Sequence, residues 1–315
     1  MDVNLNGKVA LVTGVGPNIG SGLALMLGKY GAKVACNDIR PEEAETTVKR
    51  LERNGVEAIA VPGDVSDEEQ VKAYVQKVVD TWGQIDILIN GAGIDGGASV
   101  LDFEIERWNR QISVNLTGYF LNTKWVGRQM VEKGIRGSII CLASTAGWQG
   151  RANSIGYCSS KGGIIQFVRA SAMDLAPYGI RINSFTPTAT QVDNPEVIAA
   201  RGDNTTNQSG GGPGGRGMGV PNMPGQTPRA NAGGQDDQPH KTGGSADFAS
   251  MSPLGELPTP TDYGHVVAWL CSDYARLITG SDYTVDSGAL AKYWPYVPPA
   301  EKVGPLPLIK MDVTE

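Results

Sequence analysis

The chain has 315 residues, of which 40% are hydrophobic and 19% are charged, a composition typical of a globular protein with a large core. The formal net charge of -6 argues against a surface that binds nucleic acid or an anionic membrane. Four scattered cysteines and only two histidines argue against a Ser-His-Asp triad and against a bound metal. The sequence shows neither a signal-peptide pattern nor an apolar run of about 18 residues, so we expect a cytoplasmic protein.

Short apolar runs alternate with helical patterns from the N-terminus onward. The first run, Lys8–Thr13, is followed by the glycine-rich segment GVGPNIGSG, which spans Gly14–Gly22. Glycines at a strand-to-helix turn let the backbone approach a pyrophosphate, which then rests on the helix N-terminus. The second run, Lys33–Asn37, ends at Asp38, where the spacing fits an acidic residue that binds an adenosine ribose. These features together predict a dinucleotide site.

The alternation continues along most of the chain. Strands alternating with helices predict parallel βαβ units, and therefore one doubly wound parallel sheet in a three-layer α/β/α (Rossmann) domain. Ligands of such sheets bind beyond the carboxyl ends of the strands, where Asp64, Asn90 and Ser144 also fall. We expect further strands at residues 56–61, 85–89, 137–144, 180–185 and 281–285, and helices at residues 41–54, 67–82, 105–133, 155–179 and 261–272.

One long segment breaks this pattern before the last helix and strand. Between Arg201 and Ser250, 13 of 50 residues are glycine and 5 are proline, so the segment cannot build a core of its own. We treat residues 1–315 as one domain, with residues 191–258 as an insertion and residues 292–315 as a C-terminal extension. The insertion is either a lid over a substrate or a surface segment without a role, and the sequence favours neither.

Tyr157 and Lys161 are four residues apart on the helix expected to begin near Ile155, so both side chains project from one face. An ammonium group near a phenol lowers the pKa of the phenol and makes it a usable acid and base near neutral pH. Ser144, at the end of the preceding strand, is placed to hold a substrate oxygen beside that phenol. A lone Tyr-x-x-x-Lys is more typical of an ordinary helix, so the functional interpretation depends on the other motifs.

These motifs, in this order, resemble the short-chain dehydrogenase/reductase family. The resemblance covers about Leu5 to Ala289, interrupted by the insertion. It implies an oxidoreductase that uses a nicotinamide cofactor to interconvert a secondary alcohol and its ketone. The motifs are Thr13-Gly14-x-x-x-Asn18-Ile19-Gly20, Asp64, Asn90-Gly91-Ala92-Gly93, Asn115, Ser144, Tyr157-x-x-x-Lys161 and Asn183 to Pro187.

The resemblance also implies roles for individual residues. Tyr157 would be the general acid and base, with Lys161 lowering its pKa and binding the nicotinamide ribose. Ser144 would orient the reacting oxygen, and Asn115 would hold a water molecule in a proton relay. The cofactor would contact Gly14, Asn18, Ile19, Gly20, Asp38, Asp64, Val65, Asn90, Gly91, Ala92, Tyr157, Lys161, Pro187, Thr188 and Thr190. The substrate would contact Ser144, Trp148, Asn153 and Tyr157.

Two residues depart from the family pattern. Asn18 occupies the place of the second fingerprint glycine, and we expect cofactor binding to survive because asparagine tolerates left-handed backbone geometry. Thr188 replaces a glycine beside the nicotinamide. For the cofactor, Asp38 favours NAD over NADP because a carboxylate repels a 2′-phosphate, whereas Arg40 is the one residue that favours NADP.

The substrate and the assembly are less constrained by the sequence. Trp148 fits either a platform for a flat or cyclic alcohol or simple loop packing. An alternative function is a catalytically silent NAD(H)-binding sensor or scaffold, and another is a nucleotide-sugar epimerase or dehydratase. The resemblance implies a homo-oligomer, a tetramer or a dimer, formed through the helices that carry Asn115 and Tyr157 and through the last strand.

Overall fold

The computed structural model describes residues 3–195, 198 and 252–291. Most of the predicted insertion and the predicted C-terminal extension lie outside the described residues. In the described part, seven strands form one sheet with the order β3-β2-β1-β4-β5-β6-β7, and every neighbouring pair is parallel. The doubly wound fold predicted from the sequence is confirmed. The strands are β1 (Val9–Thr13), β2 (Lys33–Asn37), β3 (Ala58–Ala60), β4 (Ile87–Asn90), β5 (Ser138–Leu142), β6 (Arg181–Pro187) and β7 (Asp282–Val285).

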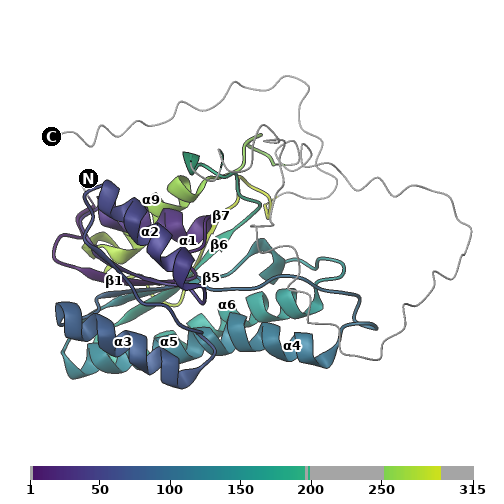
Figure 1. Cartoon of the computed structure of the whole chain (residues 1–315). Helices are drawn as coiled ribbons and strands as arrows, with labels where there is room; N and C mark the ends of the chain where they lie inside the picture. The colour runs from purple at the N-terminus through teal and green to yellow at the C-terminus, as the bar shows by residue number, and fades with distance from the viewer. Residues whose placement is uncertain (1–2, 196–197, 199–251, 292–315) are drawn as a thin grey trace, which may run out of the picture.

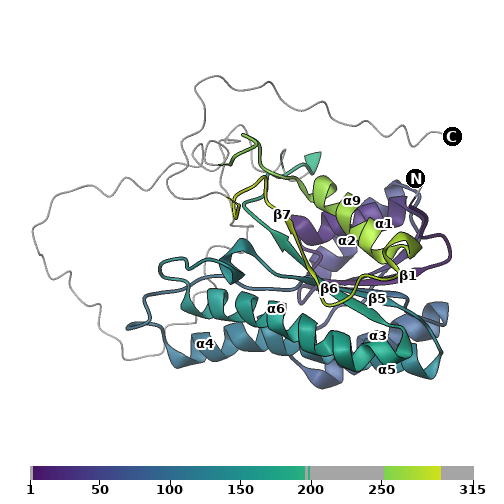
Figure 2. The ribbon, with the colours of Figure 1, turned by 180° about the vertical axis from the view of Figure 1, so that it is seen from behind.

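Helices cover both faces of this sheet (Figure 1). Seen from behind, the same two layers lie on either side of the strands (Figure 2). One layer consists of α1 (Ile19–Lys29), α2 (Pro41–Arg53) and α9 (Pro260–Cys271). The other consists of α3 (Glu68–Trp82), α4 (Ile105–Ile112), α5 (Gly118–Glu132) and α6 (Ile155–Leu175).

The apolar runs form strands because both of their faces are covered. All five residues of β1 are buried, and successive side chains point to opposite sides of the sheet. Val12 belongs to the core that includes Leu23 of α1, whereas Leu11 belongs to the core that includes Val126 of α5. Two apolar cores therefore hold the sheet between the helix layers.

Several predicted elements are shorter in the structure, since α6 ends at Leu175 and not at residue 179, and β5 ends at Leu142 and not at residue 144. Strand β3 spans only Ala58–Ala60, and the long predicted helix between residues 105 and 133 contains a π-helical turn at Ser113–Thr117. A π-helical turn inserts an extra residue into the helix and is frequent at functional sites. No helix among the described residues is long and apolar enough to cross a membrane.

The two ends of the predicted insertion meet at the N-terminal end of α9. The amide of Gln191 donates to the carbonyl of Pro258 over 3.0 Å, and the amide of Thr261 donates to Asp193 Oδ2 over 2.9 Å. The insertion therefore leaves and re-enters the domain at neighbouring points, beside the end of β6.

Candidate active site

The predicted site residues gather at the carboxyl edge of the sheet. Because all seven strands are parallel, the turns that follow β1, β2, β4, β5 and β6 leave the sheet at this one edge. The turns after β1 and β4 touch each other, since a Cβ atom on Gly14 would lie 2.5 Å from Ala92 Cα. Thr13 Oγ1 accepts hydrogen bonds from the amides of Gly91 and Ala92 at 3.1 and 3.3 Å. These contacts fix the positions of the two turns at which the sequence predicts a dinucleotide site.

Glycine is required at two positions of the first turn. Gly14 has a φ of 71°, and a Cβ atom on Gly20 would overlap the carbonyl oxygen of Gly14. Ile19 and Gly20 begin α1 directly after this turn, so the helix N-terminus faces the turn.

Asn18 takes a conformation that the sequence did not predict. Its φ is -118°, so the expectation that it uses the left-handed tolerance of asparagine is wrong. The residue precedes α1, and its Oδ1 atom is buried without a hydrogen-bond partner among the described residues. A buried acceptor of this kind needs a donor, and the hydroxyls of a dinucleotide can supply one.

Asp38 follows β2 and is only 8% exposed. Its Oδ1 atom accepts a hydrogen bond from the Arg40 amide at 3.1 Å and lies 3.7 Å from Arg40 Nε. The guanidinium of Arg40 also contacts Glu43 at 3.3 Å, so two carboxylates share its charge. A Cβ atom on Gly16 would lie 3.7 Å from Asp38 Oδ2, which places this carboxylate beside the glycine-rich turn.

Asp64 is held by partners that the sequence did not reveal. Ser66 Oγ donates to Asp64 Oδ1 over 2.6 Å, and Arg110 Nη2 lies 3.0 Å from Asp64 Oδ2. Burial raises the pKa of the Asp64 carboxyl, but the hydrogen bonds from Ser66 and the charge of Arg110 outweigh burial and lower it. Val65 is buried against Gly118 of α5. Arg110 lies 46 residues from Asp64, and no local pattern links the two.

Asn115 lies in the π-helical turn and is completely buried. Its amide nitrogen donates to the carbonyl of Ile94 over 2.9 Å and to Ser160 Oγ over 3.1 Å, while its Oδ1 atom accepts from the Ile94 amide at 2.8 Å. A Cβ atom on Gly93 would lie 3.5 Å from Asn115 Oδ1 and 3.8 Å from Lys161 Nζ. Asn115 therefore ties the loop after β4 to α6 and lies close to Lys161.

Tyr157 and Lys161 lie one turn apart near the N-terminus of α6, as predicted, and Ser144 follows β5. Lys161 is 4% exposed, and its Nζ atom donates to the Leu142 carbonyl over 2.6 Å and to Tyr119 Oη over 3.5 Å. The same Nζ atom lies 5.7 Å from the centre of the Tyr157 ring. Tyr119 was not predicted; it lies four residues after Asn115, a helical spacing that brings it to the same face.

The ionisation of this pair differs from the prediction. Burial lowers the pKa of the Lys161 ammonium to about 8. Burial also raises the pKa of Tyr157; a hydrogen bond with Ser144 and the charge of Arg151 oppose that rise, and Asp95 adds to it. The expected lowering of the Tyr157 pKa by Lys161 is therefore not found. The physical reason is that the ring is removed from water, while Lys161 directs its proton donors at Leu142 and Tyr119.

The remaining predicted cofactor residues lie on β4 and after β6. Asn90, completely buried, donates to Thr123 Oγ1 over 3.2 Å. Pro187 ends β6, and the Thr188 carbonyl accepts a hydrogen bond from Thr190 Oγ1 at 2.9 Å. Thr190 Oγ1 also lies 3.1 Å from the hydroxyl of Tyr263, a fully buried residue of α9. Helix α9 thus positions the segment that follows β6.

The two predicted substrate residues on the loop after β5, Trp148 and Asn153, have different surroundings. The indole nitrogen of Trp148 donates to Asp282 Oδ2 over 3.1 Å and to Thr186 Oγ1 over 3.4 Å, while the side chain is 49% exposed, so both interpretations of Trp148 stay open. Asn153 is exposed, with a φ of 55°, and a Cβ atom on Gly97 would overlap its carbonyl oxygen. Asn153 therefore lies where the loops after β4 and β5 meet.

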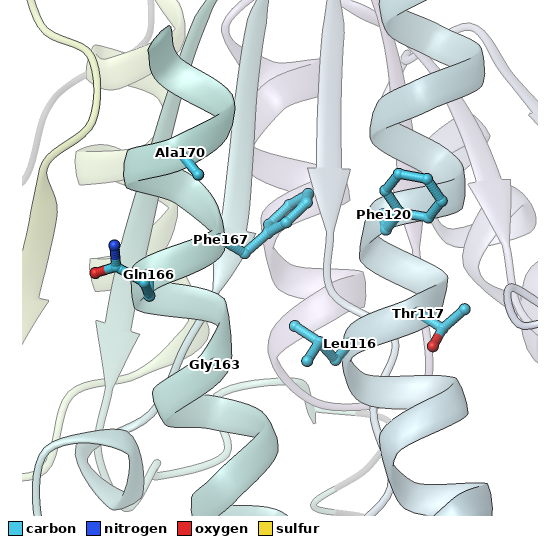
Figure 3. A pocket seen from close by; sticks show the side chains of 7 residues that line it. All are labelled: Leu116, Thr117, Phe120, Gly163, Gln166, Phe167 and Ala170. Carbon is cyan, nitrogen blue, oxygen red and sulfur yellow. The ribbon is translucent and has the colours of Figure 1, made fainter. Parts of the chain in front are cut away.

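A cavity of about 500 Å³ lies outside this edge, between the π-helical turn with α5 on one side and α6 on the other (Figure 3). Phe167 and Leu116 point into the space between the two helices, and the ring of Phe120 lies over α5 above Leu116 (Figure 3). Phe120 is 49% exposed, so an apolar surface is left open to solvent. The cavity is lined by Leu116, Thr117, Phe120, Gly163, Gln166, Phe167 and Ala170.

Comparisons with known proteins decide the family. The sequence model described as short chain dehydrogenase matches residues 8–201, well over half of the chain. The chain belongs to the short-chain dehydrogenase/reductase family. A second model, described as enoyl-(acyl carrier protein) reductase, matches residues 225–289. The protein is thus an oxidoreductase of this family, and the resemblance deduced from the motifs is confirmed.

Individual members of the family match over almost the whole chain. An uncharacterized oxidoreductase, YxbG, of Bacillus subtilis (strain 168) is 33% identical over 292 residues, which cover 92% of this chain and 94% of that protein. Cyclohexanol dehydrogenase of Acinetobacter sp. (strain SE19) is 30% identical and covers 93% and 98% of the two chains. The crystal structure of an NAD+-bound xylitol dehydrogenase matches with a TM-score of 0.71 and 30% identity, covering 90% of this chain and 99% of that chain.

Proposed function

We propose that this protein interconverts a secondary alcohol and its ketone, with NAD as the cofactor. The observation that carries the proposal is the meeting of Ser144, Tyr157, Lys161 and Asn115 at the carboxyl edge of the sheet, beside a glycine-rich turn. These four residues come from three separate segments of the chain. Similarity to a cyclohexanol dehydrogenase and to a xylitol dehydrogenase supports an alcohol as the substrate.

The chain itself supplies the proton chemistry and the positioning. Tyr157 gives a proton to the reacting oxygen or takes one from it, and Ser144 holds that oxygen beside the phenol. Lys161 and Asn115 belong to buried hydrogen-bond networks near Tyr157, since Lys161 donates to the Leu142 carbonyl and Asn115 donates to Ser160. The bound nicotinamide supplies the hydride acceptor or donor. General acid-base assistance of this kind contributes roughly 10²–10⁴ in rate.

Asp38 supports the proposed preference for NAD. The Asp38 carboxylate lies beside the glycine-rich turn, where it can accept hydrogen bonds from ribose hydroxyls and repel a 2′-phosphate. Arg40 is the residue that would favour NADP, since a Cβ atom on Gly16 would lie 3.8 Å from its Nη2 atom, but Asp38 and Glu43 share its charge. The proposed cofactor is therefore NAD.

Absorbance at 340 nm tests the proposed reaction directly. Purified protein is given NAD or NADP with pooled cyclic alcohols and polyols, beside Tyr157→Phe and the control Tyr178→Phe. Tyr178 is 55% exposed at the end of α6, outside the proposed site. We expect the wild type and the control to reduce NAD and Tyr157→Phe to be roughly 10²–10⁴ slower with unchanged NAD binding. Equal rates for Tyr157→Phe and the wild type would refute the role of the phenol.

The apolar cavity between α5 and α6 supports a homo-oligomer. Phe120 and Phe167 leave an open apolar surface on the helices named by the family resemblance, and a second copy of the chain would cover it. Sedimentation of the wild type beside Phe120→Lys tests this proposal. A wild type that sediments as a monomer would contradict it.

A further inference from the structure

An ion pair joins the two loops that flank Tyr157. Asp95 lies in the loop after β4, and Arg151 lies in the loop after β5. Arg151 Nη2 lies 2.6 Å from Asp95 Oδ1 and 2.7 Å from Asp95 Oδ2, so one nitrogen binds both oxygens of the carboxylate. The two side chains are 48% and 40% exposed, which leaves them accessible to a substrate.

Two further contacts fix the position of Arg151. Its Nε atom donates to Ser154 Oγ over 2.7 Å, and Ser154 is 6% exposed. Its guanidinium carbon lies 4.9 Å from the centre of the Tyr157 ring, a distance typical of a cation–π contact. An exposed ion pair usually contributes little to the stability of a protein. This pair differs because Arg151 also donates to Ser154 and lies against the ring of the proposed catalytic Tyr157.

The ion pair leaves little free positive charge beside Tyr157 for a substrate to contact. The positive charge of Arg151 is taken up by Asp95, and the Nζ atom of the nearby Lys161 is buried against the Leu142 carbonyl. A substrate carboxylate could reach the remaining donors of Arg151 at Nη1, but it would then lie beside the Asp95 carboxylate and be repelled by that negative charge. A hydroxyl, in contrast, can donate to Asp95 or accept from Arg151 while the pair stays intact.

We propose that the Asp95–Arg151 ion pair restricts this site to uncharged alcohols and excludes hydroxy acids. The inference rests on the proposed function and narrows its substrate class. Arg151, held in place by Ser154, could bind the carboxylate of a substrate. In this inference Asp95 occupies that position instead.

The proposal predicts opposite effects for the two partners. Asp95→Asn leaves Arg151 held by Ser154 with a free charge, so a hydroxy acid gains a charged partner and its KM falls roughly tenfold or more. Arg151→Gln leaves an unpaired carboxylate, so the hydroxy acid is excluded more strongly than from the wild type. In the double variant Asp95→Asn/Arg151→Gln, no charge remains and the gain for the acid disappears.

Matched substrate pairs test these effects. One pair is 3-hydroxycyclohexanecarboxylate and its carboxamide, and the other is gluconate and sorbitol, so each pair differs in the charge of one group. We compare kcat/KM within each pair, with NAD, for the wild type and the three variants. The controls are Arg128→Gln, an exposed arginine that stacks on Trp125 at 4.8 Å, and Asp80→Asn, an exposed carboxylate of α3. Circular dichroism verifies that each variant is folded.

The wild type is expected to prefer the uncharged member of each pair roughly tenfold, and only Asp95→Asn is expected to narrow or reverse that ratio. A wild type that uses the acid as well as its uncharged partner, or an unchanged ratio in Asp95→Asn, would overturn the inference. Failure of the proposed function would look different, because no alcohol would be oxidised by the wild type.

Saturation-transfer NMR with the same compounds on the protein plus NADH decides the inference without turnover. The inference requires that the acids bind to Asp95→Asn and more weakly to the wild type. Equal binding to the two proteins, or no binding to Asp95→Asn, would overturn it.

Discussion

The buried ammonium group of Lys161 should lower the stability of the protein, and this cost can be measured by replacing Lys161. Burial lowers its pKa from 10.5 to about 8, and at roughly 1.4 kcal/mol per pKa unit this difference destabilises the folded protein at neutral pH by about 3 kcal/mol. Lys161→Met removes this cost and also removes the hydrogen bond to the Leu142 carbonyl, worth about 1 kcal/mol. The hydroxyl of Tyr119 still donates to that carbonyl over 3.1 Å. We therefore expect Lys161→Met to be more stable by about 2 kcal/mol near pH 7 and to lose its dehydrogenase activity.

The pH dependence gives this prediction a definite sign. The folded protein holds the Lys161 proton up to about pH 8, whereas the unfolded chain holds it up to the ordinary value of 10.5. Between these values the unfolded state binds more protons, so the stability of the wild type rises with pH. The stability advantage of Lys161→Met should therefore be complete below about pH 8 and should shrink as the pH rises towards 10.5.

Urea unfolding near pH 7 and near pH 9.5 measures both effects. A suitable control is Lys77→Met, since Lys77 Nζ also donates to a backbone carbonyl, that of Ala60 over 2.9 Å, but is exposed. The control should not gain stability at either pH. Destabilisation by Lys161→Met near pH 7, or a gain that is the same at both pH values, would refute the argument that burial of this charge is costly.

Further predictions concern the cofactor, the loop after β5, the phenol and the assembly. Asp38→Asn should weaken NAD binding roughly tenfold and improve NADP binding, as measured by cofactor titration. Trp148→Phe removes the hydrogen bond to Asp282 and should lower the free energy of unfolding by about 1 kcal/mol, while KM for the alcohol stays unchanged. Because the pKa of Tyr157 is raised, kcat/KM for alcohol oxidation should increase with pH through the alkaline range as the phenol loses its proton. Phe120→Lys should convert the oligomer to smaller species in sedimentation, with folding unchanged by circular dichroism.

The sequence predicted the fold well because short-range patterns determine it. Runs such as residues 34–36 are apolar, which is the pattern of a strand buried on both faces, and each is followed by a turn and a helix. The alternation of strands and helices then predicts parallel strands with right-handed crossovers, whereas the order of the strands is known from the structure. The meeting of Asp38, Asn90 and Ser144 at one edge follows from the same rule. Spacing along α6 likewise placed Tyr157 and Lys161 on one face.

The sequence could not predict contacts between distant segments. Trp148 and Asp282 are 134 residues apart, and only the register of β7 beside β6 brings them together. The pKa of Tyr157 was mispredicted for a related reason. Helical spacing predicts that Tyr157 and Lys161 lie close together. It predicts neither how deeply the Tyr157 ring is buried nor which groups accept the hydrogen bonds of the Lys161 ammonium. Those depend on Leu142, which lies 19 residues before Lys161 on β5.

Buried acceptors without a donor gather near the carboxyl edge of the sheet. Among the described residues, Asn18, Asn37, Asn90 and Gln111 each bury a side-chain oxygen that accepts no hydrogen bond, and the three asparagines lie at this edge. Each such acceptor destabilises the free protein by about 1–3 kcal/mol. Asn37 and Asn90 are completely buried, so their oxygens face the interior of the fold and not a bound cofactor. The two apolar cores on the faces of the sheet keep the domain folded despite these unpaired acceptors.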